Sequence, residues 1–102
     1  MSLALQSAHK LIEQRLQEHA CTHLHTRIEG NSLYVYSVED GEEAYRAAMT
    51  LCKTNEFALS IADHRGYWQP VPFRGEISEI ADVLMSTFAF SLIRWPSQSA
   101  RF

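Results

Sequence analysis

Three potential metal ligands lie close together near the start of the chain. Cys21, His23 and His25 occupy alternate positions, and thiolate and imidazole groups are good ligands for zinc. On an extended strand their side chains would point to the same side, with alternate Cα atoms roughly 6–7 Å apart, and a fourth ligand would come from His19 or from a distant residue. The spacing is neither CxxC nor HExxH, and no second Cys/His cluster complements it. We therefore favour a solvated, His-rich strand face and keep a zinc site on these residues as the alternative.

A second group of polar and aromatic residues surrounds a predicted turn at Asp63–Gly66. Arg, Tyr and Trp provide rigid contact area and forked hydrogen-bond donors, which suit recognition of a partner. The turn itself accounts for Asp63 and Gly66, because Asp favours the first turn position and Gly accepts positive φ. The residues that we predict to bind a partner are His64, Arg65, Tyr67 and Trp68, with Tyr34 and Tyr36 as a second surface.

No sequence motif indicates catalysis. Asp63 and His64 are neighbours, but neighbouring residues on an extended chain face opposite ways. A Cys–His pair can generate a thiolate nucleophile, so a small enzyme built on Cys21 and its neighbouring histidines belongs to the same alternative as the zinc site. The chain has no nucleophile elbow, Gly-rich phosphate loop or paired-carboxylate motif. We therefore predict a binding protein with no catalytic residues and no cofactor.

Composition narrows the class of protein further. The chain has 102 residues, is 46% hydrophobic and carries a net charge of −3, which predicts a single globular domain over residues 1–102. The acidic balance argues against a protein that binds nucleic acid by neutralising phosphates. No apolar run is long enough to cross a membrane, and the start lacks the pattern of a signal peptide. Its two cysteines are too few for a disulfide scaffold, so we expect a reduced, cytoplasmic protein.

Periodicity predicts the elements that position these residues. Apolar residues from about Ser2 to Ala20 follow helical spacing. Gly30-Asn31 suits a two-residue hairpin turn, which places Ile28 opposite Leu33 on an apolar face. The opposite face of this hairpin then carries His23, His25, Arg27, Tyr34 and Tyr36.

The rest of the chain repeats this alternation of helices and hairpins. Ala44, Tyr45, Ala48, Leu51 and Cys52 follow helical spacing after a run of acidic residues, which predicts a second helix that stops near Asn55. Residues 57–73 alternate as a second hairpin, and its two prolines, Pro70 and Pro72, place the later strand at a sheet edge. A third helix is predicted from Gly75 onward, with Ile77, Ile80, Ala81, Leu84 and Phe88 on one face.

The predicted fold is therefore an α+β two-layer sandwich with a mainly antiparallel sheet and the order α-ββ-α-ββ-α. Part of this order, β-α-β-β-α, resembles the start of a ferredoxin-like split unit. Residues 88–95 fit either more helix or a fifth strand, and Pro96 ends this segment.

The apolar C-terminal segment also suggests self-association. It contains more large apolar residues than one core-facing stripe needs, and such a surplus often marks an interface. Homo-oligomers most often close as two-fold dimers. We therefore predict a homodimer that uses Phe90, Leu92 and Trp95, and that also recognises another protein or a small ligand.

Overall fold

The computed structural model describes residues 3–63 and 65–92, which form two α-helices, a five-stranded sheet and a short 3₁₀ helix. The elements are α1 (Leu3–Glu18), β1 (His25–Glu29), β2 (Ser32–Glu39), β3 (Glu42–Lys53), β4 (Glu56–Ala62), β5 (Trp68–Gly75), α2 (Ile77–Ser86) and η1 (Ala89–Leu92). The strands pair in chain order and every pair is antiparallel. The predicted α+β class and antiparallel sheet are confirmed.

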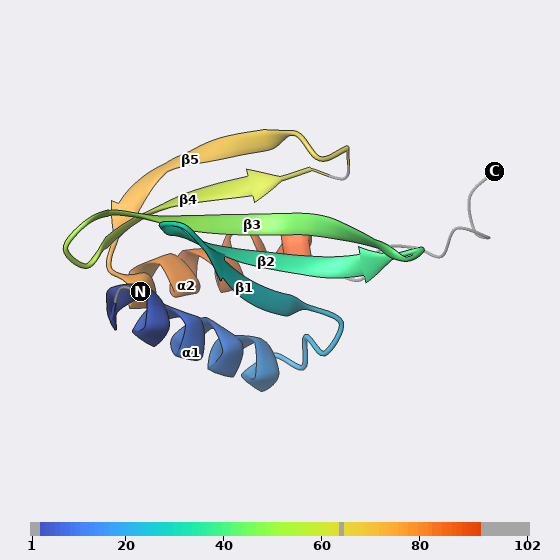
Figure 1. The fold of residues 1–102 in the computed structure, drawn as a ribbon, viewed down its shortest axis with the longest axis horizontal. Helices are drawn as coiled ribbons and strands as arrows, with labels where there is room; N and C mark the ends of the chain where they lie inside the picture. Colours follow the sequence, from blue (N-terminus) through green and yellow to red (C-terminus); the bar gives the residue numbers. More distant parts are fainter. Residues whose placement is uncertain (1–2, 64, 93–102) are drawn as a thin grey trace.

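Both α-helices lie against the same face of this sheet (Figure 1). In α1 the buried residues recur every three or four positions, which brings one apolar stripe onto the sheet. Helix α2 does the same, and its start is closed by a capping box between Glu76 and Glu79. Both helices were predicted, although α1 ends at Glu18 and Ala20 has a positive φ of 57°. The shared core comprises Leu5, Ala8, Ile12 and Leu16 of α1, Ile80, Ala81 and Leu84 of α2, and the strand residues Leu33, Val35, Ala47, Met49, Phe57, Leu59 and Ile61.

The two predicted hairpins are also present. Ile28 pairs with Leu33 across the turn at Gly30-Asn31, as the alternation of the strands predicts. Strand β5, which contains Pro70 and Pro72, is an edge strand of the sheet. This position fits proline, because a strand at an edge leaves one side of its backbone unpaired.

The predicted second helix over residues 44–52 is wrong, because this segment lies within strand β3. The acidic run that was interpreted as the start of this helix contains a turn instead. Asp40 and Gly41 have φ values of 55° and 82°, and two consecutive positive φ values make a tight hairpin turn. The spacing of the segment was misleading too, because the register shifts near Tyr45 and four consecutive residues, Arg46 to Met49, are buried. Without that helix, the α-ββ-α-ββ-α order and the ferredoxin-like unit are corrected to five consecutive strands between two helices.

The end of the described chain is a short 3₁₀ helix. Of the two alternatives for residues 88–95, the helical one holds over Ala89–Leu92, because η1 is a separate 3₁₀ helix and not a strand. Residues 93–95 lie outside the described residues. Among the helices that the structure describes, none is long and apolar enough to cross a membrane.

Candidate functional site

The sheet face opposite the helices carries a cluster of aromatic side chains. Tyr34 and Tyr36 alternate with the buried residues of β2, so they point away from the core. Tyr45 of β3 pairs in register with Tyr36. Trp68 pairs with Ala62 on β4, whose small side chain leaves room for the indole ring to reach β3. We call Tyr34, Tyr36, Tyr45 and Trp68 the aromatic face. Within the described residues no helix covers it (Figure 1).

The four rings form one connected cluster, in which Tyr45 contacts each of the other three. Tyr34 stacks on Tyr45 with 5.0 Å between ring centroids, and Tyr36 meets Tyr45 edge to face at 6.2 Å. The Trp68 ring lies 6.2 Å from both Tyr34 and Tyr45. Such pairs favour stacked or edge-to-face geometry. Trp68 nevertheless keeps 41% of its surface exposed, so the cluster is a surface and not a second core.

Arg27 of β1 joins this face. Its guanidinium carbon lies 4.4 Å from the ring centre of Tyr36 and 5.7 Å from that of Tyr45, which is cation–π geometry. Glu29 lies 3.0 Å from Nε, and Nη2 donates a hydrogen bond to Glu43. The hydrogen bond with Glu43 raises the pKa of Arg27. The guanidinium is thus held flat between aromatic rings and two carboxylates.

An acidic groove of about 430 Å³ adjoins the aromatic face. It lies between the β2–β3 turn and the β4–β5 turn, and both Tyr45 and Trp68 line it. Among the described residues, the charged members of its lining are Glu39, Asp40, Glu42, Glu43 and Asp63 together with a single cation, Arg65. The groove therefore combines aromatic rings with an excess of negative charge.

The two predicted binding surfaces, one around the Asp63–Gly66 turn and one at Tyr34 and Tyr36, partly merge into one. The structure brings Trp68 into contact with Tyr34, which is far from it in sequence, and Tyr36 joins the same cluster through Tyr45. Arg65 is exposed and lines the groove, whereas Tyr67 is 66% exposed and takes part in none of the ring contacts described above. The Asp63 carboxylate accepts hydrogen bonds from the backbone N–H groups of Arg65 and Tyr67, as turn chemistry predicts. His64 lies outside the described residues.

The three potential metal ligands do not converge. Strand β1 begins at His25, so Cys21 and His23 are not on a strand with it, as the prediction required. His23 donates from Nε2 to the carbonyl oxygen of Leu92 at 2.8 Å, and the His25 ring lies 5.4 Å from that of Tyr36. Burial raises the pKa of the Cys21 thiol, which disfavours the thiolate. In the described part of the chain, no group of three or more His, Cys, Asp or Glu residues is placed to hold a metal ion.

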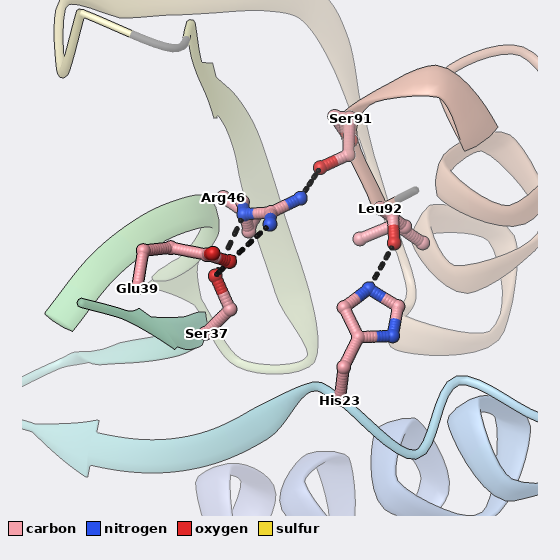
Figure 2. A network of polar contacts seen from close by, with 6 residues as sticks. All are labelled: His23, Ser37, Glu39, Arg46, Ser91 and Leu92. Carbon is pink, nitrogen blue, oxygen red and sulfur yellow. Dashed lines mark hydrogen bonds and ion pairs between the residues drawn. The ribbon is translucent and has the colours of Figure 1, made fainter. Parts of the chain in front are cut away.

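A buried arginine ties the sheet to the C-terminal 3₁₀ helix. Arg46 is 1% exposed and donates from Nε to the Ser37 hydroxyl, from Nη1 to the Ser91 carbonyl and from Nη2 to Glu39 (Figure 2). The Ser37 hydroxyl donates in turn to Glu39 at 2.7 Å. That bond, together with Arg46, holds the pKa of Glu39 below its usual range. Burial lowers the pKa of Arg46, and Glu39 acts in the opposite direction.

The predicted dimer residues fall in different environments. Leu92 is 4% exposed and belongs to the core of its own chain, so its side chain is not part of the described surface. Its role at a dimer interface stays a prediction. Its backbone carbonyl also accepts the hydrogen bond from His23 (Figure 2). The side chain of Phe90 and the whole of Trp95 lie outside the described residues.

Sequence reasoning missed two residues of this region, Tyr45 and Arg46. Both lay in the segment predicted as a helix, where Tyr45 was assigned to the core. The available signal was Asp40-Gly41 followed by a Tyr, since a hairpin at that dipeptide would have placed Tyr45 opposite Tyr36.

The fold and the site define an α+β protein with an aromatic sheet face, which none of the described helices covers, beside an acidic groove. Comparisons of this chain with protein-family models, with curated proteins and with solved structures found no match.

Proposed function

We propose that this chain is a non-catalytic binding module that recognises another protein through its aromatic face. In this proposal the fold is a two-layer α+β sandwich, and the partner binds the outer face of the sheet. One observation carries it: four aromatic side chains contact one another on a sheet face that neither α1 nor α2 covers. Tyr, Trp and Arg are the residues most enriched where protein interfaces concentrate their binding energy.

The chemistry of this face favours a protein over a single-stranded nucleic acid. Bases can stack on sheet aromatics, but such sites also need a positive groove for the phosphates. Here the nearby cation, Arg27, is paired with Glu29 and Glu43, and the adjoining groove is acidic. A phosphate backbone would therefore meet like charge at this surface.

The proposal is tested by selecting binders from a random-peptide display library against the purified, tag-free protein. We expect enriched peptides whose binding is lost in Trp68→Ala and in Tyr34→Ala, because each variant removes a ring from the centre of the surface. Circular dichroism and thermal melting check that both variants fold. The matched control is Leu3→Ala, which removes an equally apolar side chain, 80% exposed, from the helical layer.

Two outcomes contradict the proposal. One is a selection that enriches no peptide. The other is a set of enriched peptides that bind Trp68→Ala and Tyr34→Ala as tightly as the parent protein, which would place the binding surface elsewhere.

A further inference from the structure

The groove beside the aromatic face shares two of its aromatic rings. Tyr45 and Trp68 belong both to the ring cluster and to the groove lining, so the aromatic surface continues into the groove. A side chain that enters the groove therefore meets aromatic rings, with carboxylates close by.

Some carboxylates of this groove form ion pairs with arginines of the chain, and others do not. Glu39 is paired with Arg46, and Glu43 is paired with Arg27. Asp40 and Glu42 are exposed, and no Lys, Arg or His within residues 3–63 and 65–92 forms an ion pair with either of them. The groove thus keeps negative charge at its mouth that the described chain does not neutralise.

Arg27 shows what kind of group suits this combination of rings and carboxylates. Its guanidinium lies over Tyr36 and beside Tyr45 while it pairs with Glu29 and Glu43. The ring quadrupole attracts the cation, and the carboxylates balance its charge. On the other side of Tyr45, the groove lining offers the same elements in Trp68, Asp40 and Glu42. Arg65 also lines the groove, but among the described residues neither it nor any other cation pairs with these two carboxylates.

We propose that this groove binds a Lys or Arg side chain of a basic segment in the partner protein. The inference rests on the proposed function and specifies the partner that the aromatic face recognises. The cationic head lies against Trp68 and Tyr45, near Asp40 and Glu42, and the neighbouring residues of the segment cross Tyr34 and Tyr36. A volume of about 430 Å³ is enough for a long side chain and part of its backbone.

The probes are three fluorescein-labelled peptides of one design, in which three Arg residues alternate with Gly and Ser, or are all replaced by Gln or by Glu. Fluorescence anisotropy with the full chain measures their affinity at low and at high salt. We expect the Arg peptide to bind more tightly than the Gln peptide, the Glu peptide to bind least, and the affinity of the Arg peptide to fall as salt rises.

Two variants locate the site. Trp68→Ala removes the ring, and Asp40→Asn combined with Glu42→Gln removes the unpaired charges while Asn still tolerates the positive φ of position 40. We expect each to weaken binding of the Arg peptide by about tenfold. The matched control, Glu13→Gln with Glu18→Gln, changes the net charge by the same amount on α1 and should leave the affinity within about twofold of the parent.

Each contrary outcome has a defined meaning. Equal losses in the groove variant and the α1 variant would overturn the inference, because binding would then follow net charge alone. Display-selected peptides that depend on Trp68 but carry no Lys or Arg would overturn the inference and leave the proposed function standing. A dimer in native mass spectrometry that dissociates in Trp68→Ala would assign the face to a second copy of this chain and overturn the inference.

Discussion

Arg46 is a charged side chain inside a core of apolar residues, which is a costly place for a cation. Its cost is offset because three of its N–H groups donate to Ser37, Glu39 and Ser91. A buried pair of this kind adds little net stability compared with an apolar replacement, but it strongly disfavours arrangements that leave one member unpaired. Arg46 therefore specifies where η1 packs against the sheet.

The same network predicts a pH dependence of stability. The Ser37 hydrogen bond and Arg46 hold the pKa of Glu39 below its unfolded value of 4.5. A carboxyl with a lowered folded-state pKa contributes stability above its unfolded pKa, and this contribution is lost as the pH falls through the folded pKa. We expect the free energy of unfolding, measured with urea, to decline on acidification below about pH 4.5, and to decline less steeply in Glu39→Gln.

Glu18→Gln serves as the control for that experiment, because it removes an exposed carboxylate on α1 that accepts only a long hydrogen bond from Gln14. Its acid limb should match that of the parent protein. A Glu39→Gln variant with the same pH dependence as the parent would contradict this prediction, because it would show that the pKa of Glu39 does not differ between the folded and the unfolded chain.

At the scale of elements, the β2–β3 turn decides how the site is assembled. It keeps β3 in the sheet and so brings Tyr45 beside Tyr36. The turn depends on Asp40 and Gly41, whose positive φ values suit Gly and are tolerated by Asp.

We predict that Gly41→Ala lowers the free energy of unfolding by about 1–2 kcal/mol. The cost is one of backbone conformation alone, because a Cβ at this position would meet no heavy atom within 4 Å. Urea denaturation measures it, with Asp40→Gly as the control that already satisfies the left-handed conformation and should stay within about 0.5 kcal/mol of the parent. Equal stability of Gly41→Ala and the parent would contradict the assigned turn.

At the scale of the whole molecule, the question is whether the apolar C-terminal residues stabilise one chain or join two. Leu92 is buried in the core of its own chain, so Leu92→Ala should lower the free energy of unfolding by about 2 kcal/mol or more. The oligomeric state of this variant, measured by native mass spectrometry, should stay that of the parent. Leu3→Ala, at an exposed position, is the control and should cost less than about 0.5 kcal/mol. A variant that keeps its stability and changes its oligomeric state would place Leu92 at an interface.

Local patterns in the sequence were sufficient for much of the fold. The helical stripes of α1 and α2, the turn at Gly30-Asn31 and the edge position of β5 all follow from rules that act within a few residues. Three of the four residues of the aromatic face, Tyr34, Tyr36 and Trp68, were predicted as binding residues. For Tyr34 and Tyr36 the reason is again local, because alternation along β2 places them away from the core.

Only the tertiary structure decided that residues 42–53 form a strand and not a helix, and this strand assembles the site. Their apolar spacing is compatible with a helix, and pairing with β2 and β4 on both sides favours the strand. The Asp40-Gly41 turn is a local signal for that pairing, but pairs such as Ser32 with Thr50 lie outside the window in which the spacing of residues 44–52 is read. The contact of Trp68 with Tyr34 and Tyr45, and the burial of Arg46, exist only once five strands lie side by side. The sequence by itself determined which side chains are available for recognition, and the sheet determined which of them meet.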